Sequence, residues 1–159
     1  MADNYLEFSE IIANLTGPEE AWLKEQLQPI RVFDGKGHRA EVVPFLLDKT
    51  DYDLEWDALG FEYRFHDDND PGGWGRHLWF YTEDWGNADN VAWLVQKFLK
   101  QFRPQECWSL SYAATCSKPR IGEFGGGAVF VTADTIVWQN SGDFIESQRA
   151  AFDRKEATA

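Results

Sequence analysis

The clearest hydrophobic pattern in the chain is helical and precedes Pro104. Six apolar side chains recur there at intervals of three and four residues, and so share one side of a helix: Val91, Leu94, Val95, Phe98, Leu99 and Phe102. Asn87 or Asp89 can cap the start of this helix, and Pro104 ends it. The sequence therefore predicts an amphipathic helix over residues 91–102 that packs on a core.

A second helix is predicted from the capping signal at Thr16. The Thr16 hydroxyl can accept a hydrogen bond from the backbone N–H of Glu19, while the Glu19 carboxylate reaches back to Thr16. Pro18 suits the first helical turn, where the missing N–H would have no helical partner. Because Pro29 cannot continue a helix, we expect this one to run to about Gln28.

The segments on either side of this helix have less regular patterns. Residues 1–16 space their apolar side chains as in a short amphipathic helix, with an edge strand over residues 4–8 as the alternative. Residues 30–58 are expected to form an irregular segment. A strand over Ile30–Phe33 can begin this segment, and Pro44 argues against a central strand later in it.

Alternation of apolar and polar residues predicts two groups of strands, one on each side of the long helix. The first group has a strand that begins at Phe61 and an antiparallel partner over His77–Tyr81, joined by a turn rich in Asp and Gly. The second group begins with a strand in which large and small side chains alternate: Trp108, Leu110 and Tyr112 against Cys107, Ser109 and Ser111. A hairpin with strands over residues 128–132 and 135–138 follows.

A last helix is expected over Asp143–Arg154, with Ser141 as its cap and residues 155–159 as a frayed tail. The predicted order is helix, two strands, helix, three strands, helix. This order favours the α+β class, with an antiparallel sheet of about five strands and helices packed mainly on one face. The length of 159 residues, without a linker rich in Pro, Gly or Ser, predicts a single domain over residues 1–159.

The charge of the chain restricts its partners. The net charge is −12, from 27 acidic and 15 basic residues. This negative field repels phosphate backbones and anionic lipid headgroups, which disfavours direct binding of nucleic acid or a membrane surface. An acidic surface suits a basic protein partner, or it keeps the domain soluble. The sequence has no apolar stretch of membrane-spanning length and no signal peptide, so we expect a cytoplasmic protein.

One stretch carries a resemblance to other proteins. It runs from Cys107 to Asp134 and reads CWSLSYAATCSKPRIGEFGGGAVFVTAD. This stretch resembles a segment of small acidic bacterial and mobile-element proteins of no known function. The N-terminal sequences NYLEFSE and NLTGPEEAWL resemble the same group. The resemblance implies no activity, ligand or catalytic residue.

The loop over Thr115–Gly127 is the first candidate site, because two cations and three successive glycines could surround a phosphate or carboxylate. The candidate anion-binding residues are Lys118, Arg120, Gly125, Gly126 and Gly127. A strand follows these glycines where a phosphate-binding loop would open a helix. We therefore favour a structural role for them, as a bulge or tight bend where a strand enters the sheet. A small-molecule or phosphate-ligand protein, or an enzyme, that uses this loop is the alternative function.

Cys116 is the weak candidate for a catalytic nucleophile, because the neighbouring Lys118 and Arg120 favour a thiolate. Cys107 is expected to be buried and inert, and too far along a strand from Cys116 to form a disulfide. No Cys or His pair has zinc-ligand spacing, and the acidic turn over residues 67–70 departs from a calcium-binding loop. We expect no metal or cofactor, and we favour a function without catalysis.

Acidic stretches that contain aromatic residues are the second candidate site. Trp79 and Tyr81 should share one face of their strand, opposite Leu78 and Phe80. This face is either an exposed aromatic platform or half of a two-sided core. The candidate partner-binding residues are Asp67, Asp68, Asp70, Trp74, Trp79, Tyr81 and Trp85. The sequence thus favours a protein-binding module for a basic partner, one version of which is an inhibitor that covers a nucleic-acid-binding surface.

Overall fold

The computed structural model describes residues 3–33, 37, 39–49, 59–69 and 71–158. The strands of the main sheet are β1 (Asn4–Ile12), β4 (Glu62–His66), β5 (His77–Thr82), β6 (Cys107–Cys116), β7 (Gly125–Thr132) and β8 (Ile136–Asn140). The helices in the described residues are α1 (Gly17–Leu27), α2 (Ala88–Phe102) and α3 (Ser141–Ala157). A small hairpin of β2 (Ile30–Phe33) and β3 (Arg39–Val42) leads into the 3₁₀ helix η1 (Pro44–Leu46).

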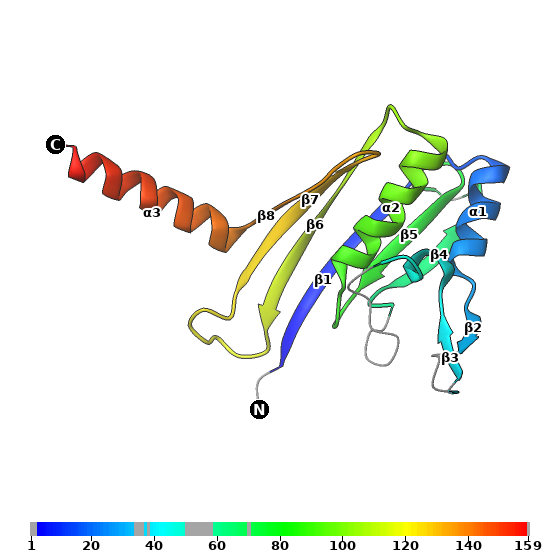
Figure 1. Ribbon diagram of the computed structural model, residues 1–159, viewed down its shortest axis with the longest axis horizontal. Coiled ribbons are helices and arrows are strands. Elements are labelled where there is room, and N and C mark those ends of the chain that lie inside the picture. Colours follow the sequence, from blue (N-terminus) through cyan, green and yellow to red (C-terminus); the bar gives the residue numbers. More distant parts are fainter. Residues whose placement is uncertain (1–2, 34–36, 38, 50–58, 70, 159) are drawn as a thin grey trace.

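The main sheet is antiparallel and has the strand order β4-β5-β1-β6-β7-β8. Helices α1 and α2 lie on one side of it (Figure 1). This arrangement confirms the α+β class. The sheet has six strands where the sequence predicts about five, because the chain begins with a strand.

The core lies between the sheet and helix α2. Leu78 and Phe80 point from β5 towards the helices and are completely buried. Val91, Leu94 and Val95 on α2 belong to the same buried cluster and are equally buried, which confirms the amphipathic helix predicted from periodicity. Each such side chain stabilises the fold by about 1.5–3 kcal/mol relative to an exposed position.

The predicted starts of α1 and α2 are confirmed. At α1 the Thr16 hydroxyl accepts from the Glu19 N–H at 3.4 Å, and a Glu19 carboxylate oxygen accepts from the Thr16 N–H at 2.8 Å. At α2 the Asn87 side chain accepts from the Asn90 N–H at 3.0 Å. Of the two candidate caps, Asn87 and Asp89, the helix therefore uses Asn87. These bonds satisfy backbone groups that a helix end leaves without a partner.

The helix predicted within residues 1–16 is wrong. The segment forms β1, and the edge strand considered for residues 4–8 is an interior strand, since Phe8 lies opposite Thr82 on one side and Tyr112 on the other. Phe8 and Ile12 are buried on the helix side of the sheet. Pairing along both edges therefore outweighs the weak helical spacing of these residues.

The region predicted to be irregular contains regular structure in its described part. The strand expected over Ile30–Phe33 is present as β2, and it pairs with β3. Pro44 begins η1, in agreement with its exclusion from a strand. Residues 50–58 lie outside the described residues.

The C-terminal elements extend beyond their predicted limits. Strand β7 begins at Gly125 and β8 ends at Asn140, so the last hairpin is longer than expected. The cap of α3 is Asn140 and not Ser141, because the Asn140 side chain accepts from the Asp143 N–H at 2.9 Å. Helix α3 continues to Ala157, through part of the expected tail, and projects away from the sheet (Figure 1).

Candidate functional site

One face of the main sheet points away from α1 and α2, and no described helix covers it (Figure 1). We call it the open face. Its side chains follow from the strand register: Arg64 and His66 on β4, His77, Trp79 and Tyr81 on β5, Ser9 and Ile11 on β1, Ser109, Ser111 and Ala113 on β6, and Ala128 and Phe130 on β7. An antiparallel sheet normally presents polar residues on such a face, whereas this one presents large aromatic rings.

An aromatic pair lies on the open face of β5. The rings of Trp79 and Tyr81 stack with 4.0 Å between their centroids and 23° between their planes. The indole N–H of Trp79 donates to the Ser9 hydroxyl at 2.8 Å, and the Arg64 guanidinium lies 5.8 Å from the centre of the Tyr81 ring. The hydrogen bond and the two ring contacts hold both side chains in one arrangement on a rigid strand.

A histidine pair lies next to the aromatic pair. His66 and His77 are opposite each other in the β4–β5 ladder, and their rings stack at 4.7 Å with an angle of 1°. The Trp74 ring meets His77 edge-on at 5.5 Å. A hollow of about 440 Å³ lies at this cluster and is lined in part by Ser9, Ile11, Trp74 and Trp79. The structure thus brings together three sequence candidates: Trp74, Trp79 and Tyr81.

The other half of the open face has small side chains. Ser109, Ser111 and Ala113 on β6, and Ala128 on β7, are all exposed. Phe130 follows on β7 with 47% of its surface exposed. Small side chains allow a partner to approach the strands closely, next to large rings that can anchor it.

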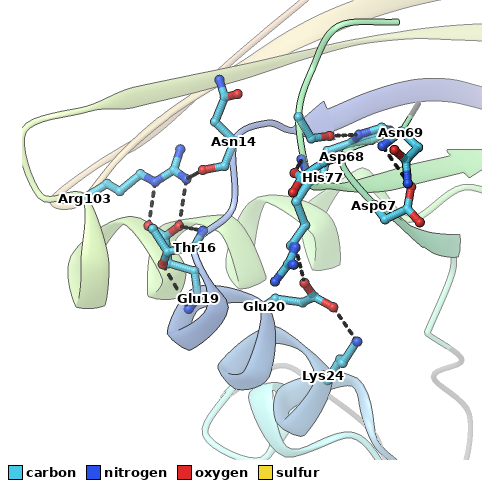
Figure 2. Close-up of polar contacts among 12 residues, drawn as sticks. Asn14, Thr16, Glu19, Glu20, Lys24, Asp67, Asp68, Asn69, His77 and Arg103 are labelled. Carbon is cyan, nitrogen blue, oxygen red and sulfur yellow. Dashed lines mark hydrogen bonds and ion pairs between the residues drawn. The ribbon is translucent and has the colours of Figure 1, made fainter. Parts of the chain in front are cut away.

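The acidic turn after β4 lies at the edge of the open face. A carboxylate oxygen of Asp67 accepts from the Asn69 N–H at 3.0 Å, and one of Asp68 accepts from the Arg76 N–H at 2.9 Å (Figure 2). Both carboxylates therefore shape the turn and place negative charge beside the histidine pair. Asp70 lies outside the described residues.

A buried ion pair joins α1 to the end of α2, and sequence reasoning missed it. Arg103 donates from Nε and Nη2 to the two carboxylate oxygens of Glu19 at 2.8 and 2.9 Å (Figure 2). Its Nη2 also donates to the backbone carbonyls of Ala13 and Asn14 at 3.2 and 3.1 Å. The hydrogen bond from Arg103 holds the pKa of Glu19 below its usual value. The sequence assigns Glu19 only a local role in the cap at Thr16, and this role does not indicate its contact with Arg103, 84 residues further along the chain.

The candidate loop is shorter than predicted. Thr115 and Cys116 end β6, and the three glycines begin β7, where Gly126 pairs with Ala113 and Gly127 with Tyr112. A Cβ atom at Gly127 would lie 2.5 Å from the Gln139 carbonyl oxygen and 2.5 Å from the Tyr112 hydroxyl. Strand β8 and the Tyr112 ring approach the backbone of Gly127 so closely that a side chain does not fit at this position. Lys118 and Arg120 remain in the loop and are exposed.

Two further sequence candidates lie apart from the aromatic pair. Cys116 is half-buried at the end of β6, on the helix side of the sheet. Trp85 is 83% exposed and lines a separate groove with Leu6 and Tyr112, also on the helix side. The expectation that Cys107 is buried is wrong, because it lies at the start of β6 on the open face and is exposed.

Comparisons with known proteins give no relative. Within the described residues, no group of three or more His, Cys, Asp or Glu side chains has the geometry to hold a metal ion. None of the helices in the described part of the chain has the length and apolar content that a membrane span requires. No family model, no curated protein and no solved structure matches this chain.

Proposed function

We propose that this protein is a non-catalytic binding module whose open face contacts a basic surface of another protein. The observation that carries this proposal is the stacked pair of Trp79 and Tyr81 on a sheet face that the described helices leave uncovered. Trp79 and Tyr81 are half-buried, and Trp and Tyr side chains that keep an accessible surface on a rigid strand are enriched among the anchors of protein interfaces.

The surroundings of the pair favour binding at low entropic cost. The hydrogen bond from Trp79 to Ser9 and the contact of Arg64 with Tyr81 fix both rings before any partner arrives. Side chains that are already ordered lose little freedom when an interface forms. The small residues of β6, such as Ser111, leave room for the partner next to the rings.

Charge supports a basic partner. The chain has a net charge of −12. Glu62 on β4 points to the open face, and Asp67 and Asp68 lie in the turn at its edge; all three are exposed. Such a field speeds the approach of a positively charged surface and repels phosphate. The specific version is an inhibitor that covers the nucleic-acid-binding surface of a cytoplasmic partner.

Affinity capture from the native host lysate tests the proposal. We expect the wild-type chain to retain a basic protein in stoichiometric amount, and the Trp79→Ala/Tyr81→Ala variant to lose it. Since this variant also loses packing, Ser111→Arg serves as a second variant that blocks the open face without removing a buried side chain. Leu47→Ala, at an exposed position outside the sheet, is the matched control and should bind as the wild type does.

Two outcomes would oppose the proposal. Equal retention of the same protein by wild type and by both open-face variants would exclude the open face as its site. A retained metabolite, lost on Lys118→Ala/Arg120→Ala substitution, would instead support the ligand site in the loop after β6. Circular dichroism of each variant confirms that a loss of binding is not a loss of folding.

A further inference from the structure

Helix α3 is an amphipathic helix without a core to pack on. None of its residues is buried, although it is 17 residues long and the structure describes all of them. Phe144, Ile145 and Phe152 are 52%, 54% and 60% exposed. With Gln148 and Ala151 they follow the helical spacing of a single stripe. An isolated helix of this length is marginal in water, so its apolar stripe needs a covering surface.

The junction with β8 directs α3 away from its own sheet. Strand β8 ends at Asn140 and α3 begins at the next residue, so no loop separates them. Asn140 holds this junction, because its side chain accepts from the Asp143 N–H at 2.9 Å and donates to the Asp143 carboxylate at 2.7 Å. A return of the helix over its own sheet would need connecting residues and the loss of this cap. The covering surface therefore belongs to a different molecule.

A groove of suitable character lies on the helix side of the sheet, next to the start of α2. It has a volume of about 810 Å³ and a mostly apolar lining that includes Leu6, Tyr112, Ala114 and Trp138. Trp85 at its margin is 83% exposed, and Trp138 is 38% exposed. The groove lies beside the first turn of α2, so a helix placed there would add to the existing helix layer.

The charges of the helix and the groove are complementary. The C-terminal half of α3, residues 149–157, contains three basic side chains, Arg149, Arg154 and Lys155, against two acidic side chains, Asp153 and Glu156, which gives a local charge of +1 in a chain of net charge −12. The groove is lined by Asp84, which is exposed, and by Asp89, which pairs with Lys49 and is half exposed. The basic end of α3 therefore suits this groove better than it suits a basic partner.

We propose that the chain forms a two-fold dimer in which α3 of each copy lies in the groove of the other. The same two surfaces meet twice in such an exchange, so the assembly closes and does not grow into a filament. The groove is on the opposite side of the sheet from the open face. An experiment that rejects the dimer therefore leaves the proposed protein-binding function standing, and the reverse also holds.

The mass of the full-length chain in solution tests the dimer. Light scattering after size exclusion should give twice the 18.3 kDa of one chain. Phe152→Glu on the helix and Trp85→Glu in the groove should each halve the measured mass. Phe33→Glu, at a position 69% exposed on β2, is the matched control and should leave the dimer intact. Because Phe152 and Trp85 are 60% and 83% exposed in one chain, we expect little change in the thermal melting of the monomeric form.

Cross-linking tests the exchange itself. In a Cys107→Ser/Cys116→Ser background, chains with Trp85→Cys are mixed with chains that carry Ile145→Cys or Phe152→Cys. A short thiol cross-linker should then join the two kinds of chain. A wild-type monomer at all concentrations, or a dimer that both glutamate variants leave intact, would overturn the proposal. Cross-links only between two α3 helices would show a helix–helix dimer and overturn the groove as the binding surface.

Discussion

Trp79 stacks on Tyr81 at 4.0 Å on one side of β5, while Leu78 and Phe80 on its other side are completely buried. The strand thus contributes to the core through one face and presents a fixed aromatic surface through the other. Core packing explains Leu78 and Phe80 fully. It does not explain why two large rings point away from the helices, and a binding surface does.

The Glu19–Arg103 pair should be a major contributor to stability. Glu19→Ala removes the bidentate carboxylate partner of the Arg103 guanidinium, which is 18% exposed, and leaves as its carboxylate contact the longer one to the exposed Glu106 at 3.4 Å. We expect the free energy of unfolding to fall by about 3 kcal/mol, as for other buried pairs that lose one member. Urea denaturation measures this change.

The control is the pair of Lys24 and Glu20 on the same helix, in which the Lys24 side chain is 55% exposed and Glu20 is half-buried. Lys24→Ala removes an ion pair between two residues that are four positions apart on one helix. The free energy of unfolding should then fall by less than about 1 kcal/mol. Equal losses for Glu19→Ala and Lys24→Ala would show that burial of the Glu19–Arg103 pair has no special effect.

Stability should decrease in acid because of two carboxylates on α1. Arg103 holds the pKa of Glu19 below its usual 4.5, and Lys24 does the same for Glu20. A carboxyl group whose pKa is lower in the folded state than in the unfolded state stabilises the fold, and its full contribution is present at pH values above the unfolded-state pKa. This stability is lost as the pH falls through the lower folded-state pKa.

Urea denaturation at a series of pH values measures this dependence. We expect the free energy of unfolding to fall below about pH 4.5 and the decrease to be smaller in Glu19→Gln, which cannot titrate at this position. Parallel curves for wild type and variant would mean that Glu19 does not contribute to the acid sensitivity.

Gly127 should tolerate no side chain. Its added Cβ atom would lie 2.5 Å from the Gln139 carbonyl oxygen, so Gly127→Ala forces β7 and β8 apart. We expect a loss of about 1–3 kcal/mol in the free energy of unfolding, as for other overpacked positions. Gly17→Ala is the control, because nothing lies within 4 Å of its added Cβ atom. A melting temperature unchanged by Gly127→Ala would show that the close contacts of Gly127 with Gln139 and Tyr112 do not require a glycine there.

The acidic turn should act on the rate of association. Asp67→Asn/Asp68→Asn keeps an oxygen acceptor for the turn hydrogen bonds and removes two negative charges from the edge of the open face. We expect slower association with the captured partner, and little change in dissociation, in surface plasmon resonance at low salt. An association rate equal to that of the wild type would exclude electrostatic attraction by this turn.

The sequence predicts the elements whose signal is local. Helix α2 follows from its apolar spacing, and the start of α1 follows from the reciprocal bonds available to Thr16 and Glu19. Strand β1 was predicted only as the alternative to a helix, and only over residues 4–8, because its residues fit a helical spacing as well as an alternating one. Its identity is decided by pairing with β5 and β6, which lie far along the chain.

The candidate site could be predicted only in part, for the same reason. Alternation on β5 places Trp79 and Tyr81 on one face, yet it cannot tell whether a helix covers that face. The contact of Trp79 with Ser9 joins β5 to β1 and depends on the strand order. Trp85 follows β5 closely in sequence but lies on the helix side, because the chain turns there to bond with Leu6 on β1.

The dissociation constant of the captured partner, measured by calorimetry for the wild type and for Ser111→Arg, tests the central claim most directly. If the open face is the binding surface, the added arginine obstructs it and repels a basic partner. We then expect binding at least about 10-fold weaker, or about 1.4 kcal/mol, with the Leu47→Ala control unchanged. Ser111→Arg binding as tight as that of the wild type would contradict the account.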